Sequence, residues 1–119
     1  MAKKKILICD DEEGIRESLN LILERDYDLS FATNGPEAIE HVKKNPTDLV
    51  ILDIKMPKMN GLETLKAIKT VKPNIKVVIA TGYKCVETAT EAVKYGAGDY
   101  IVKPFESKQV LETVSKILK

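Results

Sequence analysis

The chain has 119 residues, the size of a single compact domain, and its 44% hydrophobic and 31% charged residues exclude a disordered or low-complexity protein. Nineteen basic and eighteen acidic side chains leave a net charge of +1, so the totals carry no electrostatic footprint for direct nucleic-acid binding. No apolar run approaches the roughly 20 residues that cross a bilayer. Two cysteines in unlike contexts, Cys9 and Cys85, favour a reducing cytoplasm over a disulfide framework. We expect one cytoplasmic domain over residues 1–119.

Aliphatic runs alternate along the chain with apolar residues at helical spacing. The runs predict five strands, at Lys5–Cys9, Tyr27–Thr33, Leu49–Leu52, Val77–Ala80 and Tyr100–Val102. The helical patterns predict five helices, within Gly14–Arg25, from Pro36 to Asn45, from Leu62 to before Pro73, from Val86 through Val93 to Gly96, and around Val110–Ile117. Strand–helix repeats with short connections predict an α/β fold, a doubly wound parallel sheet with helices on both faces.

Charged and hydroxyl side chains follow four of the five predicted strands. Asp10 and Asp11 come after the first strand, Asp53 after the third, Thr81 after the fourth and Lys103 after the fifth. In such sheets ligands bind at the carboxyl ends of the strands, where these side chains would meet.

One lysine cannot neutralise three carboxylates, so a divalent cation is expected among them. Hard oxygen ligands point to Mg²⁺ or Mn²⁺. Because Mg²⁺ usually takes a couple of carboxylates together with a phosphate oxygen, the cluster is predicted to receive a phosphoryl group.

Each of these residues also has an ordinary interpretation. Asp10 or Asp11 could cap the first helix, Asp53 could begin a turn, and Lys103 could be a surface charge. Their coincidence at the same end of alternating strands favours a functional site.

Four segments give the chain a close resemblance to the receiver domains of bacterial two-component response regulators, over essentially its full length. They are Ile8–Glu12, Leu52–Gly61, Ala80–Tyr83 and Gly98–Phe105. The resemblance implies a flavodoxin-like strand order of 2-1-3-4-5. The periodicity of the sequence does not by itself give that order.

The resemblance also implies roles for individual residues. Asp53 would be the phosphoacceptor, and Asp10 and Asp11 would hold Mg²⁺ together with Asp53 and the backbone carbonyl of Lys55. A carboxylate can take a phosphoryl group to give an aspartyl phosphate, and transfer depends mainly on positioning and on neutralising the phosphoryl charge.

The same resemblance implies a switch and partners. Thr81 and Lys103 would contact the phosphoryl oxygens, the rotamer of Tyr100 would follow activation, and the Lys103–Pro104 peptide bond would be cis. The surface of the fourth helix, fifth strand and fifth helix would then change. The expected donor is a sensor histidine kinase or a histidine phosphotransfer protein, and the expected recipient is a separate target or a C-terminal output domain. No membrane or direct nucleic-acid partner is expected.

The expected activity is limited to self-phosphorylation and self-dephosphorylation, with no other enzyme function. A monomer and a phosphorylation-promoted dimer both remain open, as does a stand-alone receiver against the front of a longer regulator.

Three other functions stay open at this stage. A phosphatase with an Asp nucleophile usually carries it after the first strand with a second Asp two residues on, whereas Asp10 and Asp11 are adjacent. A flavin-binding protein would offer backbone N–H groups to phosphate, whereas Asp10–Glu13 are four successive acids. The third is a receiver-like module that is never phosphorylated, against which the complete acidic set argues.

Overall fold

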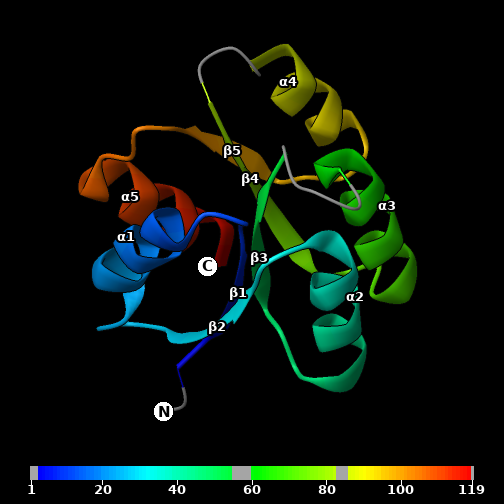
Figure 1. Cartoon of the computed structure of the whole chain (residues 1–119), viewed down its shortest axis with the longest axis horizontal. Coiled ribbons are helices and arrows are strands. Elements are labelled where there is room, and N and C mark those ends of the chain that lie inside the picture. Colours follow the sequence, from blue (N-terminus) through cyan, green and yellow to red (C-terminus); the bar gives the residue numbers. More distant parts are fainter. Residues whose placement is uncertain (1–2, 55–59, 83–85, 119) are drawn as a thin grey trace.

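The computed structural model describes residues 3–54, 60–82 and 86–118, with residues 86–89 described as backbone (Figure 1). Strands and helices alternate along these residues. In chain order they are β1 (Lys5–Cys9), α1 (Glu13–Leu23), β2 (Asp28–Ala32), α2 (Gly35–Lys44), β3 (Leu49–Asp53), α3 (Gly61–Val71), β4 (Lys76–Thr81), α4 (Val86–Lys94), β5 (Asp99–Val102) and α5 (Ser107–Leu118). Among the described residues, no helix has both the length and the apolar character needed to cross a bilayer.

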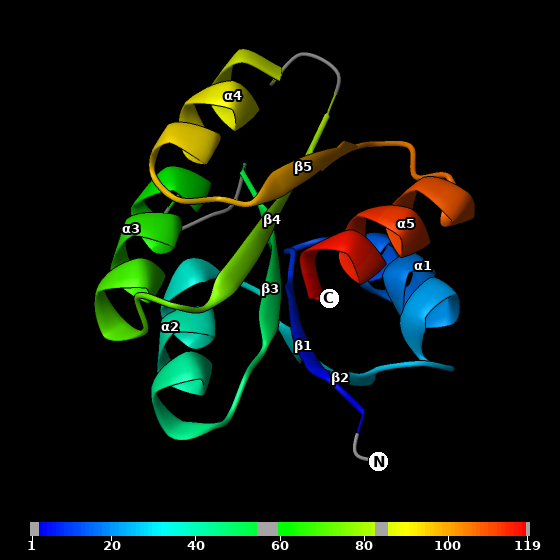
Figure 2. The same cartoon turned by 180° about the vertical axis from the view of Figure 1, so that it is seen from behind.

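The five strands form one parallel sheet in the order β2-β1-β3-β4-β5. Helices α1 and α5 cover one face, and α2, α3 and α4 cover the other (Figures 1 and 2). The predicted fold class, a doubly wound five-stranded parallel sheet of order 2-1-3-4-5 with five helices, is confirmed. Cys9 pairs with Leu52, and Thr81 pairs with Val102, so the strands end nearly level at one edge.

The central strand β3 explains why the sheet needs helices on both sides. Leu49 and Ile51 contribute to the core under α1 and α5, while Val50 and Leu52 contribute to the core under α2, α3 and α4. All four side chains are at most 1% exposed, as the unbroken apolar run predicts. The strand also extends one residue further than predicted, so that Asp53 is its last residue.

Two apolar side chains are more exposed than their spacing indicates. Phe31 on β2 is 46% exposed, because β2 is an edge strand that the flanking helices cover only partly. Val93, one of the apolar residues whose spacing predicts the fourth helix, is 43% exposed. Ala92, its neighbour in sequence, takes the buried position, and one residue along a helix turns the side chain by about 100° away from the core.

Two asparagines fix where helices begin. The side chain of Asn34 accepts the Glu37 backbone N–H at 3.0 Å at the start of α2, and Asn60 accepts the Glu63 N–H at 2.9 Å at the start of α3. Both are N-cap bonds that satisfy backbone donors left free by the helix geometry. The Asn60 cap sets the beginning of α3 beside the end of β3.

Candidate functional site

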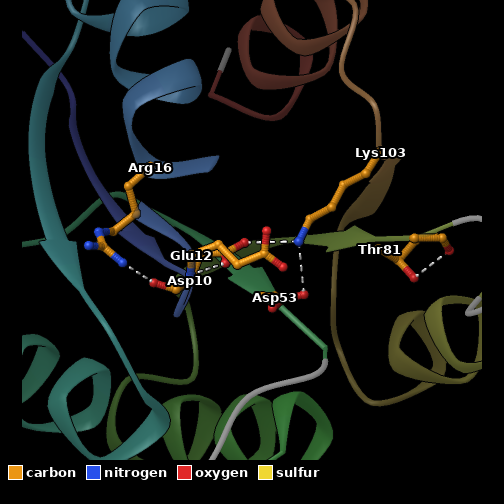
Figure 3. A network of polar contacts seen from close by, with 7 residues as sticks. Asp10, Glu12, Arg16, Asp53, Thr81 and Lys103 are labelled. Carbon is orange, nitrogen blue, oxygen red and sulfur yellow. Dashed lines mark hydrogen bonds and ion pairs between the residues drawn. The ribbon is translucent and has the colours of Figure 1, made fainter. Parts of the chain in front are cut away.

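A lysine and two buried carboxylates from three different strands meet at the carboxyl edge of the sheet (Figure 3). Asp10 directly follows β1, Asp53 ends β3 and Lys103 directly follows β5. The Lys103 Nζ lies 3.0 Å from Asp10 Oδ2 and 3.3 Å from Asp53 Oδ1. The side chains of Asp10 and Asp53 are 2% and 7% exposed, so the ion pairs are largely shielded from solvent.

A third carboxylate opens this cluster to solvent. One oxygen each from Asp10, Asp11 and Asp53 lies within 4.8 Å of the others, and Asp11 is exposed. Three carboxylates, one of them open to water, are a hard donor set that suits a partly hydrated Mg²⁺, so the residues present fit the ion that the sequence predicts. The predicted fourth ligand, the backbone carbonyl of Lys55, lies outside the described residues.

The backbone around Asp10 answers the capping alternative. Asp10 Oδ1 accepts the Glu12 N–H at 2.9 Å, which closes a turn just before α1. Helix α1 begins at Glu13 with Glu12 as its N-cap, and no side chain caps it. Neither Asp10 nor Asp11 is therefore the helix cap, and Asp10 Oδ2 is directed toward Lys103.

The surroundings of Lys103 keep its ammonium group protonated. Burial would lower the pKa of its ammonium group, but the hydrogen bond to Asp10 and the negative charges of Asp53 and Asp10 outweigh burial and raise that pKa above its ordinary value of 10.5. Lys103 is therefore a fixed point charge across the neutral range.

Thr81 lies in the same cleft, which is lined by Asp11, Glu12, Asp53, Ile54, Thr81, Gly82 and Lys103. Its side chain is buried, and its hydroxyl donates to the Gly82 carbonyl at 3.1 Å, away from the carboxylates (Figure 3). The Lys103 N–H donates to the Thr81 carbonyl at 2.7 Å, which ties the two strand ends together.

The last two predicted features lie on β5 and just after it. The Lys103–Pro104 peptide bond is cis, as the resemblance implies. Tyr100, the predicted switch aromatic, is half-buried on β5 and packs against the core under α2, α3 and α4.

The sequence did not single out two residues that support the site. Gly61, the first residue of α3, donates its N–H to the Ile54 carbonyl at 2.7 Å, and a Cβ there would lie 2.6 Å from the Asp53 carbonyl oxygen. Arg16 on α1 donates from Nη1 to the Asp10 carbonyl at 2.8 Å. Gly61 ends the segment Leu52–Gly61, which carries part of the family resemblance. The backbone contact that requires a glycine there is apparent only from the structure.

The thiol next to Asp10 is predicted to be inert. Burial, followed by the charges of Asp10 and Asp53, raises the pKa of Cys9 to about 12, and its Sγ lies 3.3 Å from the Asn34 carbonyl oxygen. Because the thiolate is the reactive form, iodoacetamide at pH 8 should leave Cys9 unmodified in the native chain and alkylate it in urea. Peptide mass mapping of both samples checks this, and native alkylation of Cys9 would contradict the burial described here.

Comparison with known proteins agrees with this arrangement. The model of the response regulator receiver domain family matches residues 6–115. The chain belongs to that family. It is 40% identical over 119 residues to Sporulation initiation phosphotransferase F of Bacillus subtilis, covering 99% of this chain and 96% of the relative. It also matches the crystal structure of a CheY-like receiver domain protein from Methanospirillum hungatei with a TM-score of 0.92 and 32% identity, over 98% of this chain and 94% of the other.

A further relative is much longer than this receiver domain. Transcriptional regulatory protein ZraR of Klebsiella oxytoca is 43% identical over 114 residues, which are 95% of this chain and 26% of that protein. The chain therefore spans about a quarter of this relative's length. Receiver domains are regulatory phosphoacceptors of two-component systems, and phosphorylation and Mg²⁺ binding are general features of the family. Membership favours the receiver over the phosphatase and the flavin-binding protein.

Proposed function

We propose that this receiver domain accepts a phosphoryl group on Asp53 and passes the signal on through the surface formed by α4, β5 and α5. The observation that carries the proposal is the placement of Lys103 between two buried carboxylates from different strands, 3.0 Å from Asp10 and 3.3 Å from Asp53. A third carboxylate, Asp11, lies beside this pair and is open to solvent. Such a cluster is suited to receiving another anionic group with a metal ion.

Asp10, Asp11 and Asp53 would hold Mg²⁺, with Mn²⁺ as a substitute. When bound, the ion would neutralise charge on the phosphoryl oxygens. A carboxylate oxygen of Asp53 would attack phosphorus, forming the Asp53 O–P bond as the bond from phosphorus to the donor imidazole nitrogen breaks. The electron pair of the broken bond stays on the imidazole. Lys103 Nζ would turn from Asp53 Oδ1 toward the phosphoryl oxygens, supplying positive charge without transferring a proton.

Thr81 and Tyr100 would couple phosphorylation of Asp53 to the surface formed by α4, β5 and α5. The Thr81 hydroxyl now donates to Gly82, and a phosphoryl oxygen in the cleft would offer it a charged acceptor instead. Turning the hydroxyl inward frees space beside β4, into which the Tyr100 ring would move. Phosphorylation shifts this equilibrium only as far as the phosphoryl group interacts better with the inward arrangement.

The partners follow from the chemistry. The donor would be a phosphohistidine on a sensor histidine kinase or a histidine phosphotransfer protein in the cytoplasm. The recipient would be a separate target or an output domain of a longer regulator, acting on either a monomer or a phosphorylation-promoted dimer. No enzymatic turnover beyond self-phosphorylation and self-dephosphorylation is proposed.

Labelling with acetyl phosphate tests the proposal. The chain with Mg²⁺ should gain the mass of one phosphoryl group, and removing the metal with EDTA should abolish the gain. Asp53→Asn should remain unlabelled, whereas Asp26→Asn, a matched change at an exposed aspartate after α1, should label normally. Equal labelling of Asp53→Asn and the unmodified chain would reject Asp53 as the acceptor.

A further inference from the structure

Four bonds hold Asp10, and one of them comes from a residue that has no role in the proposed function. The Asp10 N–H donates to Ala32, Oδ1 accepts from Glu12, and Oδ2 accepts from Lys103. The fourth bond runs from Arg16 Nη1 to the Asp10 carbonyl at 2.8 Å. That carbonyl lies just past the end of β1. Arg16 thus provides a charge-assisted partner for this backbone acceptor.

The two cations act on opposite ends of the same residue. Figure 3 shows Lys103 on the carboxylate side of Asp10 and Arg16 on its carbonyl side. The Lys103 contact is the one that metal and phosphoryl binding would exchange. The Arg16 contact is to the main chain, so it can persist while the Asp10 side chain changes its partner. The same carbonyl belongs to the peptide bond between Asp10 and Asp11, so the Arg16 contact also restrains the backbone that carries the exposed Asp11 side chain.

We propose that Arg16 is a positioning residue for the magnesium site, which it serves by fixing the Asp10–Asp11 peptide without touching the ion. The proposal rests on the function proposed above and adds to it a residue from α1. Removal of a group that holds a metal-ligating residue in place typically lowers the metal affinity about 10-fold or more.

A purely electrostatic role for Arg16 predicts the opposite change in Mg²⁺ affinity, so the direction of the change distinguishes the two roles. Arg16 follows a run of four acids at Asp10–Glu13, and its removal makes this edge of the molecule more negative. If Arg16 acted only through its long-range charge, its loss would attract Mg²⁺ more strongly and tighten binding. If Arg16 positions the peptide, its loss weakens binding despite the added negative charge.

Calorimetric titration of the metal-free chain with Mg²⁺ in about 0.1 M salt, where charges beyond roughly 10 Å are largely screened, distinguishes the two. Arg16→Met keeps the apolar stem and removes every donor, and we expect it to weaken Mg²⁺ binding about 10-fold. Arg16→Lys restores a charged donor and should recover most of the affinity. Arg25→Met is the matched control, because Arg25 is an exposed arginine after α1 whose loss changes the net charge equally. It should bind Mg²⁺ as the unmodified chain does.

The outcomes separate this proposal from the one on which it rests. Unchanged or tighter binding by Arg16→Met would overturn the positioning role alone, and so would failure of Arg16→Lys to bind better than Arg16→Met. Lack of Mg²⁺ binding by the unmodified chain would reject the proposed function together with it. Should Arg16→Met fail to fold, Arg16→Gln, which keeps a neutral donor, takes its place in the comparison with Arg16→Lys.

Discussion

Lys103→Met should lower the free energy of unfolding of the metal-free chain by about 2 kcal/mol at neutral pH, since it leaves two buried carboxylates without their shared cation. Breaking a fully buried pair typically costs about 3–5 kcal/mol, and the figure is reduced here because the cleft admits solvent. Urea unfolding measures the difference. Lys108→Met, at an exposed position on α5, is the matched control and should change stability by less than about 0.5 kcal/mol.

The pH and metal dependence of this difference can be stated in advance. The folded-state pKa of Lys103 is raised above 10.5, so its contribution is complete below that pH and is lost as pH rises through the raised pKa. The gap between the unmodified chain and Lys103→Met should therefore stay constant through neutral pH and close in strong alkali. Mg²⁺ should stabilise Lys103→Met more than the unmodified chain, because the ion supplies the missing positive charge. Equal stability of the two metal-free chains would contradict the ion-pair geometry.

Gly61→Ala should lower the free energy of unfolding by about 3 kcal/mol, at the upper end of the usual range for overpacking. The added Cβ would lie 2.6 Å from both the Asp53 carbonyl oxygen and the Ile54 Cα. These are backbone atoms of β3 and the residue after it, so the start of α3 must move away or the phosphoacceptor must shift. We also expect the rate of Asp53 labelling to fall, because a displaced carboxylate no longer faces Lys103 and the metal site together.

Gly14→Ala is the control for this change. Gly14 lies within α1, and a Cβ there would meet nothing within 4 Å. An alanine should leave stability unchanged or raise it by up to about 1 kcal/mol, through its better helix propensity. Urea unfolding of both variants measures the contrast. Similar midpoints for the two variants would show that α3 does not press on β3 as described.

The sequence predicted the elements and the site edge for clear physical reasons. Apolar periodicity reports which side chains are covered, so Leu49–Leu52 identified a central strand without any coordinates. The carboxyl ends of parallel strands share one edge, and that rule alone brought Asp10, Asp53 and Lys103 together. The strand order required the family resemblance, because periodicity does not say which strands are neighbours.

Other features depend on packing across distant segments and were not predictable in this way. The close approach of Gly61 to β3 and the bond from Arg16 to the Asp10 carbonyl both join parts of the backbone that no local pattern relates. Val93 continues the helical spacing of α4, but the way that helix packs on the sheet buries its neighbour Ala92 and leaves Val93 43% exposed.

The most direct test identifies the aspartate that carries the acyl phosphate. After labelling with acetyl phosphate and Mg²⁺, borohydride reduction converts an aspartyl phosphate to homoserine, which peptide sequencing by mass spectrometry can place. We predict homoserine at position 53 in the labelled chain and at no position in the EDTA-treated sample. Homoserine at position 10 or 11 instead, or a label that survives without any reducible acyl phosphate, would contradict the account.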